Sequence, residues 1–185
     1  MRIISGTYRG LTVTGFDIKG TRPTMDRVKE SMFAMIQGHI KNQVVLDLFA
    51  GSGNLGLEAI SNGAKKTYFV DFNQKAVSTI LENIERMRIT EAYEVLKMDY
   101  KLALKTLASR NIKFDVVLLD PPYRKSFINE ILEQLVTMHL LAPQALVVCE
   151  YDQEELKSEH LTCIKERRYG NKYVKIYQNQ IDGCN

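Results

Sequence analysis

One pattern recurs along most of this 185-residue chain: a short apolar run is followed by a segment with helical periodicity. Short apolar runs are typical of strands buried on both faces, and a following helix lets the chain cross back over a sheet. The alternation therefore predicts a mostly parallel α/β sheet with helices on both faces. The expected strands are 44–49, 67–70, 93–97, 114–119 and 145–150, and the expected helices are 54–62, 73–88, 100–110 and 127–140.

The C-terminal part of the chain departs from this alternation. Segments 161–168 and 173–178 flank Tyr169-Gly170-Asn171-Lys172, which has the composition of a hairpin turn. We therefore expect a seven-stranded, mostly parallel sheet that ends in an antiparallel C-terminal hairpin.

The N-terminal part adds a smaller unit ahead of the first expected strand. Segments 3–6 and 11–14 predict a small β-hairpin, and a helix over 24–37 with Thr24 as its N-cap follows. We expect a single domain over 1–185, in which 1–40 form the hairpin-and-helix extension and 41–180 form the core.

A glycine-rich segment, Asp47-Leu48-Phe49-Ala50-Gly51-Ser52-Gly53, stands where the first strand meets its helix. Glycines let the backbone turn tightly near a ligand, and the N-terminus of the helix attracts a carboxylate or a phosphate. Gly51, Gly53 and Gly56 also fit the dinucleotide pattern GxGxxG. Asp71 ends the second strand, where it can accept hydrogen bonds from a ribose. The segment predicts a ribose-containing cofactor, and a glycine-rich turn without a ligand is the alternative.

Two features favour S-adenosylmethionine over a nicotinamide dinucleotide. Asp47 places a carboxylate ahead of the loop, where it would repel a pyrophosphate but favour an ammonium and a sulfonium. The fourth strand ends in Asp120-Pro121-Pro122-Tyr123, at the sheet edge where ligands of such folds bind. The prolines stiffen the backbone, so that Asp120 can accept hydrogen bonds from an exocyclic amine and Tyr123 can stack on a flipped base. A rigid loop with no ligand is the alternative interpretation of the two prolines.

Charge is unevenly distributed along the chain. The formal net charge is +3, with +3 in residues 1–30, −3 in 31–156 and +4 in 157–175. Basic segments of this kind attract phosphate backbones, although solvated surface charge explains them equally well.

Composition excludes several other classes of protein. No apolar run approaches the roughly 20 residues that span a bilayer, and no signal peptide is visible, so we expect a cytoplasmic protein. The three cysteines lack CxxC spacing and the three histidines are scattered, so neither a zinc site nor any other metal site is expected.

On these motifs the chain resembles the class I methyltransferases that carry a (D/N)PP(Y/F) motif. It resembles more closely the RsmD-type 16S rRNA guanine-N2 methyltransferases of bacteria, over nearly its whole length. The central motifs indicate the reaction class. The narrower assignment depends on Arg2-Ile3-Ile4-Ser5-Gly6, on Tyr8-Arg9-Gly10, and on Arg22-Pro23-Thr24-Met25-Asp26-Arg27-Val28.

The resemblance implies a Rossmann-like fold, S-adenosylmethionine as the cofactor, and roles for individual residues. The implied catalytic residues are Asp120, Pro121, Pro122 and Tyr123. The implied cofactor-binding residues are Asp47, Phe49, Ala50, Gly51, Ser52, Gly53, Asp71, Phe72, Met98, Asp99 and Tyr100. For Asp99, at the adenine end, an ordinary helix N-cap is the alternative role, and one side chain can fill both roles. Arg9, Arg22 and Thr24 are candidates for contact with RNA, with a helix-start loop as the alternative for the last two.

The expected reaction is direct transfer of the sulfonium methyl to guanine N2 in small-subunit ribosomal RNA, free or within a particle, by a monomeric enzyme. Rate enhancement would come mainly from positioning. The same chemistry serves DNA adenine-N6 and protein glutamine-N5 methyltransferases, which remain alternatives. A nicotinamide-dependent oxidoreductase would need a substrate domain that is not visible, and a non-catalytic RNA-binding module would not need both Asp120 and Tyr123.

Overall fold

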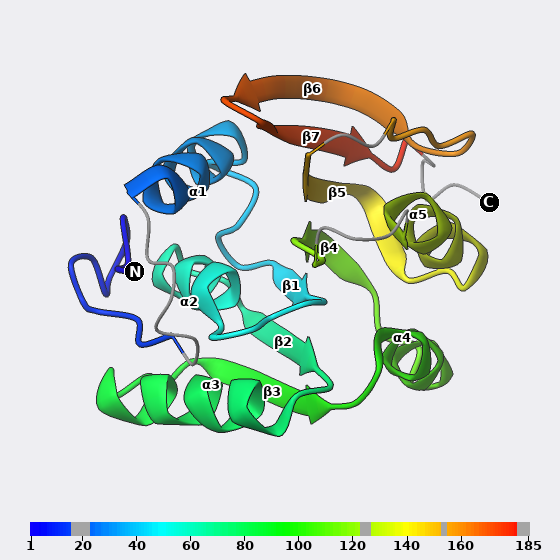
Figure 1. The fold of residues 1–185 in the computed structure, drawn as a ribbon. Helices are drawn as coiled ribbons and strands as arrows, with labels where there is room; N and C mark the ends of the chain where they lie inside the picture. Colours follow the sequence, from blue (N-terminus) through cyan, green and yellow to red (C-terminus); the bar gives the residue numbers. More distant parts are fainter. Residues whose placement is uncertain (16–22, 123–126, 153–154, 181–185) are drawn as a thin grey trace.

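The computed structural model describes residues 1–15, 23–122, 127–152 and 155–180, and the side chains of 23–25 lie outside this description. Helices and strands alternate along the chain as the sequence predicts (Figure 1). The helices are α1 (Pro23–Met35), α2 (Asn54–Ser61), α3 (Gln74–Arg86), α4 (Tyr100–Ser109) and α5 (Phe127–Thr137). The strands are β1 (Val44–Asp47), β2 (Lys66–Asp71), β3 (Ala92–Lys97), β4 (Phe114–Leu119), β5 (Leu141–Tyr151), β6 (Thr162–Tyr169) and β7 (Lys172–Gln178).

The strands form a single seven-stranded sheet with the order β3-β2-β1-β4-β5-β7-β6. Strands β1 to β5 are parallel to their neighbours, whereas β7 runs antiparallel to both β5 and β6. The predicted parallel sheet with an antiparallel C-terminal hairpin is confirmed. The order reverses after β1, which is the point where open α/β sheets place their ligands.

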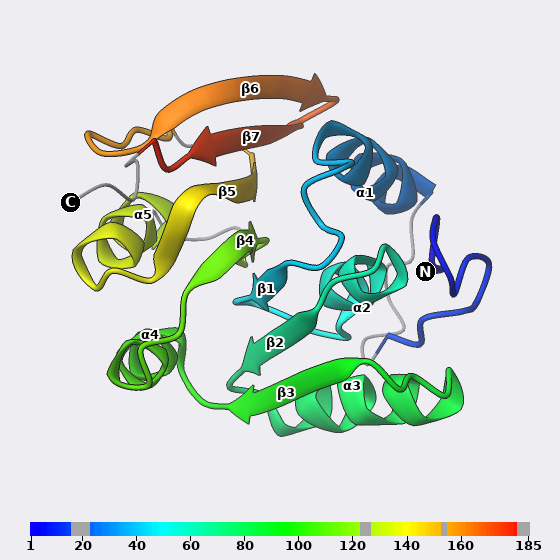
Figure 2. The same cartoon turned by 180° about the vertical axis from the view of Figure 1, so that it is seen from behind.

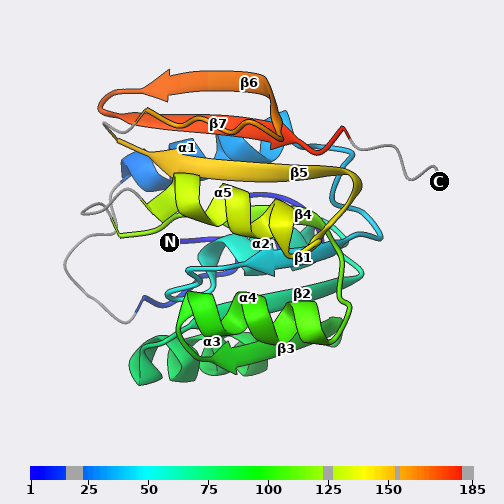
Figure 3. The same cartoon turned by 90° about the vertical axis from the view of Figure 1, so that its right-hand side faces the viewer.

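Helices cover both faces of the sheet, as the doubly apolar strands require. Helices α4 and α5 pack on one face, which Figure 3 shows from the front. Helices α1, α2 and α3 cover the other face, and Figure 2 shows α1 next to the β6–β7 hairpin. Val116 and Val117 of β4 point to opposite faces and are both 0% exposed, as are Val45 and Leu46 of β1, so the central strands are closed to water on both sides.

The N-terminal segment is a hairpin-like arm that packs against α2 and α3. Three backbone hydrogen bonds cross it, with donor–acceptor distances of 2.9 Å, but only Arg2 and Thr12 form a β-bridge. The arm is therefore less regular than the strands predicted over 3–6 and 11–14. The amides of Ile4 and Ser5 donate to the buried Glu58 carboxylate of α2 instead of pairing across the arm.

Other element boundaries differ from the predictions by a few residues. Strand β1 ends at Asp47 and not at 49, because the chain turns there into the glycine loop, where Gly51 has a φ of 54°. Strand β5 begins at Leu141, earlier than expected, because Leu141 pairs with Phe114 ahead of an irregularity in the β4–β5 register. No helix in the described ranges is long and apolar enough to cross a membrane.

Candidate active site

Acidic residues gather at the carboxyl ends of four neighbouring parallel strands. Asp47 and Asp71 are the last residues of β1 and β2, Asp120 directly follows β4, and Glu150 lies next to the end of β5. Because β1 pairs with β2 and β4, and β4 with β5, these side chains share one edge of the sheet. Carboxylates placed this close repel one another and favour a cationic ligand.

Asp47 lies beneath the glycine loop and is 1% exposed. Its Oδ2 atom accepts a hydrogen bond from the amide of Gly56 in the first turn of α2, at 2.8 Å. Its Oδ1 atom is buried and has no hydrogen-bond partner among the described residues. Burial raises the pKa of Asp47 to about 7, against the Gly56 hydrogen bond, which lowers it, and with a further increase from the charge of Asp71.

The glycine loop connects β1 to α2 in a conformation that needs its glycines. Gly51 and Gly53 have φ values of 54° and 81°, which side chains rarely tolerate. Gly56 allows α2 to approach β2, since a Cβ atom there would lie 2.2 Å from the ring of Phe69. The predicted loop of Phe49, Ala50, Gly51, Ser52 and Gly53 therefore lies at the carboxyl edge, between Asp47 and α2.

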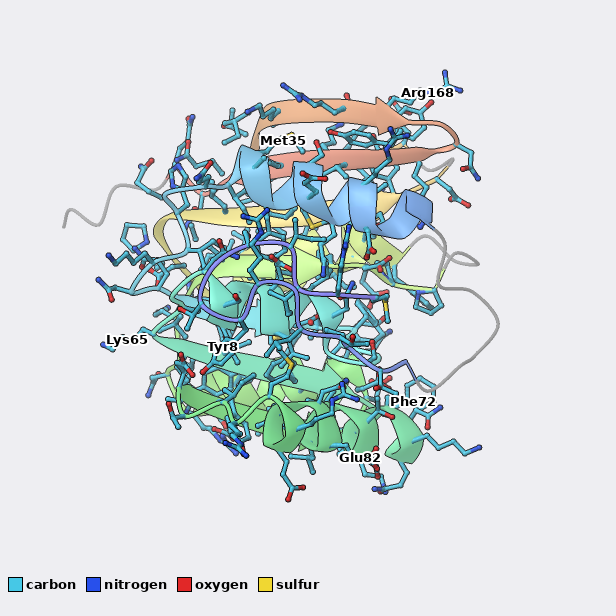
Figure 4. The ribbon with its side chains drawn as sticks, turned by 90° about the vertical axis from the view of Figure 1, so that its left-hand side faces the viewer. Tyr8, Met35, Lys65, Phe72, Glu82 and Arg168 are labelled. Carbon is cyan, nitrogen blue, oxygen red and sulfur yellow. The ribbon has the colours of Figure 1, made fainter. Side chains whose placement is uncertain are left out.

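Asp71 is fixed beside this loop by two backbone amides. Its Oδ2 atom accepts from Gly51 at 2.9 Å, and its Oδ1 atom accepts from Asn73 at 2.8 Å. A half-buried carboxylate keeps further lone pairs for ligand hydroxyls. Phe72, next along the chain, is 73% exposed, and Figure 4 shows it at the same end of the molecule as the start of α1.

The segment after β3 adds an aromatic cluster to the same edge. The ring of Tyr100 lies 5.5 Å from that of Phe49 and 5.7 Å from that of Phe127. The Tyr100 hydroxyl is buried without a hydrogen-bond partner in the described part of the chain. Met98 packs against the same core and donates its amide to the carbonyl of Asp71 at 3.1 Å.

Asp99 is exposed and acts as the N-cap of α4, where its side chain accepts from the amide of Lys101 at 2.8 Å. The N-cap interpretation is confirmed. The contact of Asp99 with adenine stays a prediction.

Asp120 is half-buried at the end of β4. Burial is the main factor that raises its pKa, to about 8. The negative charges of Glu150 and Asp47 act in the same direction, whereas the positive charge of Lys172 opposes them. Pro121, which follows, is buried, and Pro122 is exposed.

The remaining predicted residues are less well placed or not described. Tyr123 and Arg22 lie outside the described residues, as does the side chain of Thr24. Arg9 is exposed, but the structure does not bring it to Asp120. Its neighbour Tyr8 donates its amide to Ser61, the last residue of α2, and its hydroxyl to Glu91, ahead of β3. Ser61 and Glu91 both lie toward the amino-terminal ends of the parallel strands, away from Asp120.

Three residues that the sequence analysis did not single out belong to the site. Asn83 of α3 donates from its side chain to the carbonyl of Ser52 and to that of Thr14, both at 3.0 Å, and so connects the glycine loop to the N-terminal arm. Glu150 and Lys172 form an ion pair beside Asp120. Glu150 carried the same signal as the predicted aspartates, an acidic residue at the end of an apolar strand.

In the described ranges, no group of three or more His, Cys, Asp or Glu side chains comes together as a metal site.

Known proteins resemble this chain over nearly its full length. "Ribosomal RNA small subunit methyltransferase D" of Haemophilus influenzae is 34% identical over 182 residues, which cover 97% of this chain and 94% of the relative. The protein of the same name from Escherichia coli is 30% identical, covering 99% and 92% of the two chains. Among solved structures, "Putative methyltransferase yhhF" from Escherichia coli superposes with a TM-score of 0.84 at 29% identity, covering 98% of this chain and 99% of that one.

Residues 1–178 match the family described as "Conserved hypothetical protein 95". Membership therefore extends through the N-terminal arm, the glycine loop, the Asp120 segment and the C-terminal hairpin. This chain belongs to that family, and the resemblance to RsmD-type methyltransferases is confirmed.

Proposed function

We propose that this protein transfers a methyl group from S-adenosylmethionine to the exocyclic N2 amine of a guanine in small-subunit ribosomal RNA. The observation that carries the proposal is the position of Asp47. Its carboxylate caps the first turn of α2 through the Gly56 amide, where a dinucleotide would place its pyrophosphate. A cationic ligand suits this site, and the relatives named above are ribosomal RNA methyltransferases.

The residues present fit S-adenosylmethionine. The partnerless Oδ1 atom of Asp47 can accept from the ammonium of the methionine part, and Asp71 can accept from the ribose hydroxyls. Met98, Tyr100 and Phe49 supply apolar and aromatic surface for the adenine. When bound, this cofactor supplies a methyl group on a positively charged sulfur.

Asp120 and its two prolines would hold the accepting base. Guanine offers two adjacent donors, N1–H and N2–H, which an ionised carboxylate can accept together. The carbonyl of Pro121 would accept from the same amine, and Tyr123 would stack on the flipped base. The amine nitrogen held there would bond to the methyl carbon as the carbon–sulfur bond breaks, with release of S-adenosylhomocysteine and loss of the amine proton to solvent.

The RNA is expected to lie over the basic hairpin, which we define as Lys165, Arg167 and Arg168 of β6. Tyr173 near the start of β7 pairs with Tyr151 at the end of β5, so the turn of the hairpin lies at the same edge as Asp120. Figure 4 shows Arg168 toward the end of the molecule where Phe72 lies, away from Lys65. Arg167 and Arg168 are exposed and can contact phosphates there. We further propose that the enzyme acts in the cytoplasm as a monomer.

The proposal is tested with ribosomal RNA from cells that lack the gene. Purified protein and S-adenosylmethionine are incubated with the naked 16S RNA or with small-subunit particles, and the nucleosides are separated by mass spectrometry. We expect N2-methylguanosine to accumulate with one of the two substrates and to be absent with Asp120→Ala. N6-methyladenosine in DNA, or a methylated glutamine in protein, would instead establish one of the alternative methyltransferases.

A further inference from the structure

Two charged side chains, Glu150 and Lys172, stand beside Asp120 and have no role in the reaction as proposed so far. Leu119 of β4 pairs with Cys149 of β5, so Asp120 and Glu150, the next residues of these parallel strands, are neighbours. Lys172 opens β7, and its ammonium donates to Oε1 of Glu150 in a close ion pair. The side chain of Lys172 is 19% exposed and that of Glu150 is 9% exposed, so water screens the pair only weakly.

Among the described residues, the charged groups that act on Asp120 come from three strands: Glu150 from β5, Lys172 from β7 and Asp47 from β1. Burial, Glu150 and Asp47 raise the pKa of Asp120 to about 8, whereas the positive charge of Lys172 lowers it. Without the ammonium, the carboxyl would hold its proton to a still higher pH.

Protonation would change what Asp120 can do for the base. An ionised carboxylate accepts two hydrogen bonds side by side, whereas a protonated one turns one oxygen into a donor. The adjacent N1–H and N2–H donors of guanine need the ionised form. A positive neighbour at Asp120 therefore bears directly on whether the amine can be held.

We propose that Lys172 is a positioning residue for methyl transfer: its ammonium, held beside Asp120 by the ion pair with Glu150, favours the ionised carboxylate that accepts two hydrogen bonds from guanine. The inference rests on the proposed function, because it takes Asp120 as the residue that holds the amine. The alternative is that the ion pair only holds β5 and β7 together. If the ion pair acts on Asp120, removal of Lys172 and removal of Glu150 should shift the Asp120 titration in opposite directions.

The experiment titrates Asp120 in the ligand-free protein by NMR of carboxyl-labelled aspartate, with the Asp120 signal identified by its loss in Asp120→Asn. Lys172→Met should move the titration midpoint up by about 1 pH unit, the lower end of what an opposite charge contributes. Glu150→Gln should move it down, because it removes the negative charge that raises the pKa of Asp120. Lys172→Arg, which keeps the charge, should stay near the unmodified protein.

Single-turnover methyl transfer should show the same opposite displacements. The rising limb of the pH–rate profile should move up in Lys172→Met and down in Glu150→Gln. At a pH well below the limb, a displacement of about one unit makes transfer by Lys172→Met about tenfold slower than that of the unmodified protein.

Lys66→Met is the matched control, since Lys66 also pairs with a glutamate on a neighbouring strand, Glu94 at 3.3 Å, but at the opposite edge of the sheet. It should leave the Asp120 titration in place. Thermal melting and binding of S-adenosylhomocysteine check that each variant is folded.

An unchanged Asp120 midpoint in Lys172→Met, or a displacement in the same direction in both variants, overturns this inference and leaves the proposed function standing. Should the unmodified protein methylate no RNA at all, the proposed function fails, and the role given to the ion pair fails with it.

Discussion

Asp47→Asn should make the ligand-free protein more stable at high pH while it weakens the cofactor site. The pKa of Asp47 is raised from its ordinary 3.8 to about 7 in the folded state, chiefly by burial. Between these two values the folded state binds more protons than the unfolded chain. Stability is therefore lost as the pH rises through this window, and the loss is complete above pH 7.

The size of the effect follows from the width of that window. Between pH 5 and pH 7 the folded protein loses about 1.4 kcal/mol per unit, or about 3 kcal/mol in total. Asparagine does not titrate, and its amide oxygen can still accept from Gly56. Its amide nitrogen can be left without a partner, which costs about 1–3 kcal/mol at every pH. The difference in unfolding free energy between the two proteins should therefore change by about 3 kcal/mol from pH 5 to pH 8.

Urea denaturation at pH 5 and pH 8 measures this change, because the constant cost of asparagine cancels in the comparison. Asp115→Asn is the matched control: it removes a carboxylate at the other end of the sheet, where Asp115 accepts from the amide of Val44 at 2.8 Å. If Asp47→Asn and the unmodified protein lose stability in parallel from pH 5 to pH 8, Asp47 does not carry the buried charge assigned to it.

Three further predictions concern the ligands. Asp71→Ala should weaken binding of S-adenosylhomocysteine in calorimetry by about 1.5–3 kcal/mol, the range for hydrogen bonds to a charged group, and unchanged affinity would remove Asp71 from the site. Tyr123→Ala should slow single-turnover methyl transfer roughly 5- to 150-fold, as loss of about 1–3 kcal/mol of stacking implies. Tyr123→Phe keeps the ring and should keep most activity, so equal loss of activity in both variants would refute stacking. The double variant Arg167→Ala/Arg168→Ala should reduce the slope of log binding constant against log salt concentration, measured in filter assays, by about one unit per lost phosphate contact. An unchanged slope would show that the two side chains are solvated surface charges without contact to RNA.

The order of strands and helices could be predicted because each central strand is apolar on both faces, as in Val44-Val45-Leu46. Such strands must be covered by helices on both sides, and sequential pairing then leaves few topologies. The N-terminal arm was less predictable. The amides of Ile4 and Ser5 are satisfied by Glu58, a carboxylate more than fifty residues away, and local patterning contains no trace of that partner.

The site was predictable where it depends on position in a strand. Asp47, Asp71 and Asp120 end apolar runs, and parallel strands bring such ends to one edge. The contribution of Lys172 was not predictable in the same way. Lysine in a hairpin reads as a solvated surface charge, and only the antiparallel return of β7 alongside β5 brings it to Glu150.

The buried acidic groups also explain why this edge cannot be optimal for stability. Burial of Asp47 and Asp120 raises both pKa values toward neutrality, so part of the folding free energy is lost when they ionise near pH 7. A core built only for stability would place apolar side chains at these strand ends, as it does one residue earlier with Leu46 and Leu119, each 0% exposed. Binding of a positively charged ligand offsets this loss of folding free energy, because an ammonium or sulfonium stabilises the ionised carboxylates. The electrostatic cost of the empty site and its preference for a cationic cofactor therefore have a single cause: carboxylates packed at the ends of buried strands.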